Sequence, residues 1–308
     1  MIVIAAAAVS IAAQAPDQGS VSVGFASDLR TASPTMGCTN TQTRIPGGGV
    51  FPNSLGTSTS LDGRQWTVPA AVHDGPVAVD MFNNCTGPGD IPEYASKLST
   101  VVIDRDGVEI TGYIHADNYF ELWVNGRFVG RDSIPMVPFN TSVVRFRARY
   151  PMTYAIKGVD WETHVGVGLE YPTFNVGDGG FLAYFSDGNG THGDWRAETF
   201  YIAPLDDPAC VRGRDSTFCS QAARPACAAG DQKTCKALHF AVPDAWISRD
   251  FDDSRWPRAI VWPAAAVTDA PAYTNYTRFF GDAEFIWTRN LKLDNLVLAR
   301  YTARGPRR

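Results

Sequence analysis

The sequence predicts an all-β protein, an antiparallel β-sandwich with long loops and a disulfide-stapled excursion. The clearest sign is the stretch Gly112–Gly130, in which two alternating runs flank the pair Asn125-Gly126. Asn and Gly both tolerate positive φ, so this pair favours a type I′ hairpin turn. The 28 glycines, 20 prolines and 12% aromatic residues agree, because they suit short strands and many turns. Beyond the first residues, no segment carries an apolar stripe of helical period.

The strand before the Asn-Gly pair has two different faces. Successive side chains of a strand point to opposite sides, so alternate residues share a face. One face is expected to close the core, and it carries Phe120, Leu122 and Val124. The other is expected to present aromatic side chains with polar edges, and it carries Tyr119, Glu121 and Trp123.

Further strand signals recur at the spacing expected of a sandwich. A short edge strand is expected over 21–25, followed by long loops. Other strand signals lie within 66–80 and over 100–104, 108–111, 142–148, 153–159, 180–185, 195–202, 260–262, 285–287 and 296–298. Within 142–148, Val144, Phe146 and Ala148 alternate with arginines, so one side of that strand should face water.

The first fifteen residues are typical of a secretory signal. An apolar run ends in Ala13-Gln14-Ala15, which matches an A-x-A cleavage site. The usual positively charged leader is missing, and a buried terminal helix is the alternative. No stretch is long enough to span a membrane. The predicted organisation is a signal peptide at 1–15, a loop-rich β segment packed on the sandwich at 16–99, and the sandwich at 100–308 with a cysteine-rich insertion at about 206–240.

Six cysteines support export. The last four are separated by eight, seven and seven residues, unlike the close pairs that hold structural zinc. Disulfides are therefore predicted, with Cys38–Cys85 as one pair and three possible connectivities among Cys210, Cys219, Cys227 and Cys235. The four N-x-S/T sequons are compatible with a glycosylated protein that is secreted or held at the cell surface; they lie at Asn84, Asn140, Asn189 and Asn275.

Two motifs resemble a known family. The stretch Ala116–Gly126 resembles the ADN-x-x-x-L-x-VNG hairpin of galactose-binding-domain-like jelly rolls, the β-sandwich modules attached to many glycoside hydrolases. The stretch Trp246–Ala259 looks like their W…FDDS-x-W-x-x-A strand and turn. The resemblance implies a jelly roll in which the acidic-Ser turn caps the backbone and the tryptophan packs on the sandwich. The second motif usually precedes the hairpin, whereas here it follows, which indicates a permuted or differently ordered sandwich.

The strongest candidate for a binding site follows the strand at 153–159. Trp161 could stack on a sugar ring while nearby carboxylates accept protons from its hydroxyl groups. The predicted carbohydrate-binding residues are Asp160, Trp161, Glu162, His164 and Tyr171. The alternative is that Trp161 fills the core and the two acids hold a turn.

Two loops rich in Asp and Gly form the second candidate. Their carboxylates could surround a structural calcium ion, with Asp178, Asp187 and Asp194 as ligands. The spacing does not match an EF-hand, and ordinary hairpin turns are the alternative. No other cofactor is required.

These features predict a secreted, non-catalytic carbohydrate-binding or cell-surface adhesion protein whose partner is a glycan or cell-surface polysaccharide. A net charge of -5 gives no sign of a basic surface that would bind nucleic acid or an anionic membrane. A structural subunit of an extracellular wall, fibre or appendage is an alternative. A polysaccharide-acting hydrolase or lyase is another, although the adjacent acids Asp206/Asp207 and Asp252/Asp253 would point to opposite faces of a strand. No known catalytic motif is present, and the oligomeric state is open.

Overall fold

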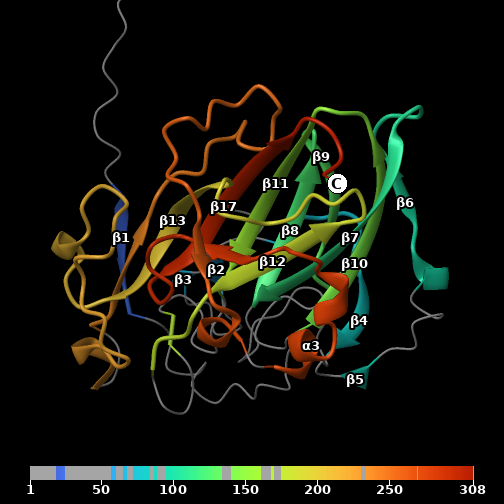
Figure 1. The fold of residues 1–308 in the computed structure, drawn as a ribbon. Helices are drawn as coiled ribbons and strands as arrows, with labels where there is room; N and C mark the ends of the chain where they lie inside the picture. The colour runs from blue at the N-terminus through green and yellow to red at the C-terminus, as the bar shows by residue number, and fades with distance from the viewer. Residues whose placement is uncertain are drawn as a thin grey trace, which may run out of the picture.

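The computed structural model describes residues 19–24, 57–59, 65–67, 72–83, 87–88, 95–133, 140–160, 168–169, 175–229, 234–268 and 270–307. Two large sheets of almost entirely antiparallel strands form a β-sandwich (Figure 1), which confirms the predicted fold class. A separate short ladder joins β2 (Thr57–Thr59) to β3 (Gln65–Thr67). No helix in the described ranges has the length and apolar character needed to cross a membrane.

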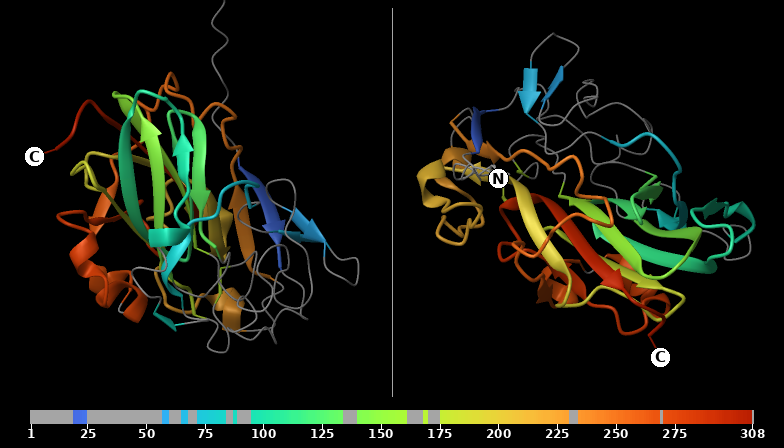
Figure 2. Two further views of the ribbon diagram at one scale, coloured as in Figure 1. Left: turned by 90° about the vertical axis from the view of Figure 1, so that its right-hand side faces the viewer. Right: turned by 90° about the horizontal axis from the view of Figure 1, so that it is seen from above.

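The first sheet has seven strands, and the last strand of the chain lies at its centre. Its order is β1 (Ser20–Val23), β14 (Lys236–His239), β13 (Arg196–Leu205), β17 (Asp294–Ala303), β11 (Met152–Val159), β8 (Tyr119–Val124) and β9 (Arg127–Arg131). The blue strand β1 lies at one edge, beside β14 (Figure 2).

The second sheet has eight strands. Its order is β15 (Ile260–Trp262), β16 (Phe285–Trp287), β12 (Gly180–Phe185), β7 (Val108–Asp117), β10 (Asn140–Ala148), β4 (Val79–Asn83) and β5 (Gly87–Pro88), with β6 (Thr100–Val102) parallel to β10. Residues before position 100 thus supply strands to both sheets. The helical elements with defined bounds in the described ranges include α3 (Pro271–Thr274), η2 (Pro208–Cys210), η3 (Ala226–Ala229), η4 (Ala264–Ala266) and η5 (Thr277–Phe279).

The hairpin of β8 and β9 turns as the sequence predicts. Asn125 and Gly126 have φ values of 51° and 79°, the pair of positive values that a type I′ turn requires. The Asn125 side chain also accepts a hydrogen bond of 2.8 Å from the backbone N–H of Thr153, which ties the turn to the start of β11.

The main core fills the space between the two sheets. Phe120, Leu122 and Val124 belong to it, which confirms the predicted inner face of β8. Tyr154 of β11 stacks on Phe185 of β12 with ring centroids 4.2 Å apart, so the two layers interlock. On β10, Val144, Phe146 and Ala148 are buried while Arg145 and Arg147 remain half-exposed, as the alternation predicts.

Packing against the inner face of the seven-stranded sheet requires a glycine at position 158. A Cβ on Gly158 would lie 2.6 Å from the Trp287 ring, closer than real Cβ contacts. Trp287 is fully buried, and its indole N–H donates to the carbonyl oxygen of Asp294 at 2.9 Å. The missing side chain therefore lets the indole pack closely against β11.

The outer face of the seven-stranded sheet carries the predicted aromatic residues and is covered by loops. Trp123 packs edge-on against Trp246 with centroids 5.1 Å apart, and both are buried. Glu121 is also buried, where its carboxylate pairs with Lys157 Nζ at 2.5 Å and accepts a 2.8 Å hydrogen bond from the Tyr119 hydroxyl. Partners of this kind are needed when a charge is taken out of water. The face of β8 that carries Tyr119, Glu121 and Trp123 is thus part of a second core.

Two disulfides staple the cysteine-rich insertion, as predicted. Cys210 bonds to Cys219 and Cys227 to Cys235, which selects the sequential connectivity among the three possible ones. Cys227 and Cys235 lie in the second core together with Cys219. The predicted Cys38–Cys85 pair lies outside the described residues.

Candidate functional site

Only part of the predicted carbohydrate platform falls within the described ranges. Asp160 follows β11, is 1% exposed, and donates its backbone N–H to the carbonyl oxygen of Asn295 at 3.0 Å. The other four residues, Trp161, Glu162, His164 and Tyr171, lie outside those ranges. The platform therefore stays a prediction.

The three predicted calcium ligands have separate surroundings. Asp187 accepts a 2.7 Å hydrogen bond from the Asn189 amide and another from the Tyr150 hydroxyl. Asp194 pairs with Arg258, and Asp178 is exposed. Within the described part of the chain, no three His, Cys, Asp or Glu side chains form a group that could hold a metal ion. The structure thus does not gather these carboxylates into one site.

A different site lies where the first disulfide loop meets the seven-stranded sheet. A pocket of about 250 Å³ opens there, between β13, the loop Cys210–Cys219, the segment after β16 and the start of β17. We call it the arginine pocket. Its charged lining residues are Arg212, Arg214, Arg258, Arg289, Glu198, Asp215 and Asp294.

The loop wall of the arginine pocket is fixed at several points. Ser216 Oγ donates a 2.7 Å hydrogen bond to Asp294 Oδ1, and Asn290 Nδ2 donates to the Ser216 carbonyl oxygen at 3.2 Å. Arg214 Nη1 donates to the carbonyl oxygen of Thr199 on β13 at 3.0 Å. Because the disulfide also closes the loop, this wall is held in place before any ligand arrives.

Asp294 holds the loop wall through its hydrogen bond from Ser216. Its second carboxylate oxygen accepts a 2.5 Å hydrogen bond from the Thr288 hydroxyl, so both oxygens have protein partners. Burial raises the pKa of the Asp294 carboxyl to about 7, although the bonds from Thr288 and Ser216 act in the opposite direction. Near neutral pH this carboxyl therefore carries less than a full negative charge.

Arg214 also has a supporting role. Its guanidinium lies 4.1 Å from the centroid of the Phe200 ring and 4.7 Å from that of Phe240. These cation–π contacts, together with the bond to Thr199, hold it against β13. Arg214 thus contributes positive charge to the pocket while its geometry is set by the protein.

The exposed arginines form the rim. Arg212 lies above the Phe218 ring at 3.9 Å from its centroid, and its backbone pairs with that of Asp215. Burial acts to raise the pKa of Asp215, but hydrogen bonds from Thr217 and the charges of Arg289 and Arg212 outweigh it and lower that pKa. The rim is therefore a place where positive charge outweighs negative charge.

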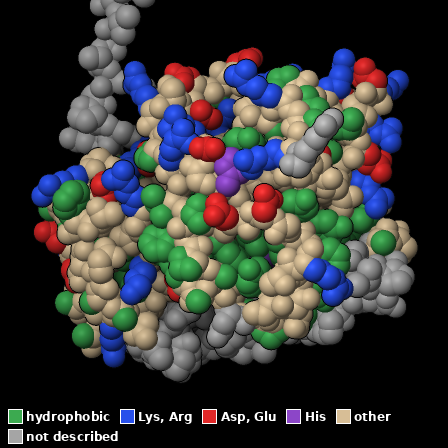
Figure 3. Space-filling view, in the orientation of Figure 1, with side chains coloured by type: hydrophobic (Ala, Val, Ile, Leu, Met, Phe, Trp, Pro, Cys, Tyr) green, Lys and Arg blue, Asp and Glu red, His purple; other side chains and the backbone are tan. Residues whose placement is uncertain are grey.

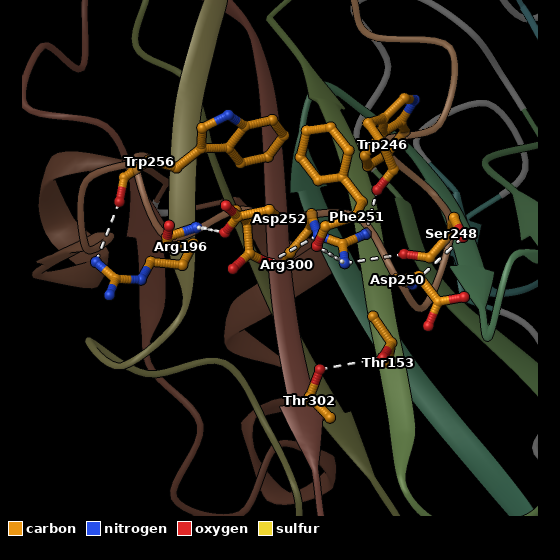
Figure 4. A network of polar contacts seen from close by, with 12 residues as sticks. Thr153, Arg196, Trp246, Ser248, Asp250, Phe251, Asp252, Trp256, Arg300 and Thr302 are labelled. Carbon is orange, nitrogen blue, oxygen red and sulfur yellow. Dashed lines mark hydrogen bonds and ion pairs between the residues drawn. The ribbon is translucent and has the colours of Figure 1, made fainter. Parts of the chain in front are cut away.

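The second sequence motif, Trp246–Ala259, has a structural role that Figure 4 makes visible. Arg300 of β17 is 2% exposed and reaches into the loop, where Nε donates to Asp253 at 2.8 Å and Nη2 donates to the Ser248 carbonyl at 3.0 Å. Its Nη1 also bonds to the carbonyl of Trp246. Four protein acceptors, completed by the Phe251 carbonyl, satisfy this buried cation.

The turn of that motif behaves as the resemblance implies. Asp252 Oδ1 accepts a 3.0 Å hydrogen bond from the backbone N–H of Ser254, and Trp256 packs against Phe251 and Phe200 at 5.4 and 5.7 Å. The other acidic pair is similar, because Asp206 accepts from the N–H of Cys227 and Asp207 from that of Ala209. Asp206, Asp207 and Asp252 thus hold backbone amides, while Asp253 holds Arg300.

Sequence reasoning did not find the arginine pocket. Its arginines are spread from position 212 to position 289, and only the fold brings them together. One local signal was available, since Arg212-Gly213-Arg214 places two cations inside the nine-residue span of a predicted disulfide.

The chain matches no protein-family model, no curated protein and no solved structure. The architecture, an antiparallel β-sandwich of two sheets, is compatible with a jelly roll. Any functional conclusion therefore rests on the geometry of the sites themselves.

Proposed function

We propose that this protein is a secreted, non-catalytic carbohydrate-binding protein and that the arginine pocket holds the sugar. The observation that carries the proposal is a concave, polar pocket whose loop wall is fixed by a disulfide and by bonds to β13 and β17. Its volume of about 250 Å³ lies just below the usual range for drug-sized ligands, so it suits one sugar residue.

The disulfides support an extracellular setting. Both described disulfides belong to the insertion that builds the pocket, and disulfides persist in oxidising compartments. On the face drawn in Figure 3, basic and acidic side chains are interspersed. Such a face suits a small, local recognition site.

The pocket carboxyls support binding over hydrolysis. Glycosidases need two carboxyl groups about 5–10 Å apart across the bond that is cleaved. Asp294 gives both oxygens to Ser216 and Thr288, and Asp215 accepts two bonds from Thr217. Glu198, the third pocket carboxylate, accepts a 3.0 Å hydrogen bond from the backbone N–H of Thr199. All three carboxyls are thus engaged by the protein's own donors.

The test is a glycan array followed by isothermal titration calorimetry on the full chain. Pro257→Trp adds bulk at the pocket and is expected to abolish binding of the best glycan. Val261→Trp, at an exposed position outside the pocket lining, is the matched control and should bind normally. Absence of any bound glycan, or equal loss in the two variants, would reject the proposal. Release of reducing sugar from a bound polysaccharide would show that the protein is a hydrolase and not a non-catalytic binding protein.

A further inference from the structure

We propose that the arginine pocket selects an anionic sugar, one that carries a carboxylate or a sulfate group, and that Arg212 and Arg289 bind that group. This inference rests on the proposed function and specifies the chemical class of its ligand. It follows from the charge of the lining, the availability of the two guanidinium groups and their placement by the fold.

The lining has an excess of positive charge in an acidic chain. Four arginines face three carboxyl groups, whereas the whole chain has a net charge of -5. Burial keeps one of the three, Asp294, partly protonated near neutral pH, which increases the excess. A concave site with an excess of one sign of charge concentrates ligands of the opposite sign.

Arg212 and Arg289 are free to take a ligand. Both are exposed, and neither guanidinium donates a hydrogen bond to any residue that the structure describes. Arg258 pairs with Asp194, but both side chains are more than 60% exposed, and such surface ion pairs are weak enough to be exchanged. The two rim arginines thus have donors to offer, and a third can join them.

The guanidinium group matches the proposed ligand. Its planar fork donates two parallel hydrogen bonds to a carboxylate or sulfate, which gives both strength and orientation. Arg212 is held above the Phe218 ring at one side of the pocket, and Arg289 follows β16 at another. A ligand between them would be held by its charge at the rim while its hydroxyl groups face the polar lining.

The experiment compares matched ligands at low and physiological salt by calorimetry. The ligands are a trigalacturonate, a sulfated galactose oligosaccharide and neutral galactotriose, with inorganic sulfate as the minimal anion. The wild-type protein should bind at least one acidic sugar roughly tenfold more tightly than the neutral one, and binding should weaken as salt rises.

Variants test whether Arg212 and Arg289 contact the anionic group of the sugar. Arg212→Gln and Arg289→Gln should each weaken acidic-sugar binding by roughly tenfold and leave neutral-sugar binding within about twofold. Arg105→Gln removes an exposed arginine outside the pocket lining and should change neither. All three positions are exposed, and equal melting temperatures will verify that the variants fold.

The possible outcomes separate this inference from the proposed function. Neutral sugars that bind as tightly as acidic ones, with no effect of the two arginine variants, would overturn the anionic class and leave carbohydrate binding intact. Inorganic sulfate that binds as tightly as the sulfated sugar would overturn selection of a sugar. Absence of binding by every sugar would overturn both proposals.

Discussion

Asp294 couples the arginine pocket to pH through a single buried carboxyl. Its folded-state pKa of about 7 is far above the value of about 3.9 expected in an unfolded chain. Below pH 4 both states hold the proton. Between pH 4 and pH 7 the unfolded state releases it first, so this group lowers the stability of the fold as pH rises. Across that window the loss of unfolding free energy is roughly 1.4 kcal/mol for each step of one in pH.

We predict that Asp294→Asn removes this pH dependence. The amide is uncharged throughout, so the stability of the variant relative to wild type should increase between pH 4 and pH 8 by on the order of a few kcal/mol. Urea denaturation at several pH values measures this difference. Asp244→Asn, at an exposed carboxyl, is the control. Parallel stability curves for wild type and Asp294→Asn would show that the carboxyl is already ionised in the fold.

Arg300 shows what residue-level sequence reasoning can and cannot find. The turn of Asp252 and Ser254 was predictable, because side chains of this type accept bonds from an amide two residues on. The partner of Asp253 was not, since Arg300 is 47 positions away and no local pattern links them. A candidate site predicted from residues close in sequence misses partners that lie far away in the chain. The arginines of the pocket, which are dispersed along the sequence, were missed for this reason.

At the scale of elements, the two disulfide loops have different roles. The first forms a wall of the arginine pocket, and the second crosslinks the insertion. The Cys210–Cys219 loop lines the arginine pocket with Arg212, Arg214, Asp215 and Ser216, whereas none of the described residues between Cys227 and Cys235 is among the lining residues. The two disulfides close loops of nearly equal length, with sequence separations of 9 and 8. They should therefore contribute similarly to stability and differently to binding.

We predict that the double variant Cys210→Ser/Cys219→Ser loses ligand affinity. Removing either disulfide should cost roughly 2–3 kcal/mol of unfolding free energy, because short closed loops restrict the unfolded chain. Only loss of the first should also weaken glycan binding, by roughly tenfold, as the wall becomes mobile. Cys227→Ser/Cys235→Ser is the matched control. Calorimetry under conditions where both variants are folded will compare them, and equal affinities would contradict the assigned role of the loop.

The strands were largely predictable and their coverings were not. Period-two alternation located β8 and β10, strand signals located β11 and β12, and the Asn-Gly pair gave the turn after β8. Alternation says which side chains share a face, but not whether a distant loop will pack on that face. Trp123 is buried where Trp246 returns across the sheet, and Glu121 accepts a 2.7 Å hydrogen bond from the backbone N–H of His73, another distant segment. That return depends on long-range packing, which sequence periodicity does not record.

At the scale of the whole molecule, burial decides which sequons can carry a glycan. Asn140 and Asn189 are 2% and 1% exposed, and their amides donate to Asp132 and Asp187 respectively. Asn275 is exposed at the end of α3. A glycan on either buried asparagine would prevent the observed packing.

We predict that folded protein secreted from a glycosylating host carries a glycan at Asn275 and none at Asn140 or Asn189. Glycopeptide mass spectrometry gives the occupancy of each site. Asn275→Gln should remove the modification of this part of the chain without changing the melting temperature by more than about 2 °C, since surface substitutions are close to neutral. Glycan on Asn189 in monomeric, folded material would contradict the packing described for Asp187.

The position of β17 has a consequence for how this protein is made. During synthesis, all the remaining strands of the seven-stranded sheet leave the ribosome before β17. Residues 294–303 of β17 pair with β11 on one side and β13 on the other. The two halves of that sheet have no common partner until then, so a premature stop codon ahead of position 294 would leave both with unpaired edges. Such truncated chains should aggregate, and chaperones that shield nascent chains should matter most in the interval before this last strand emerges.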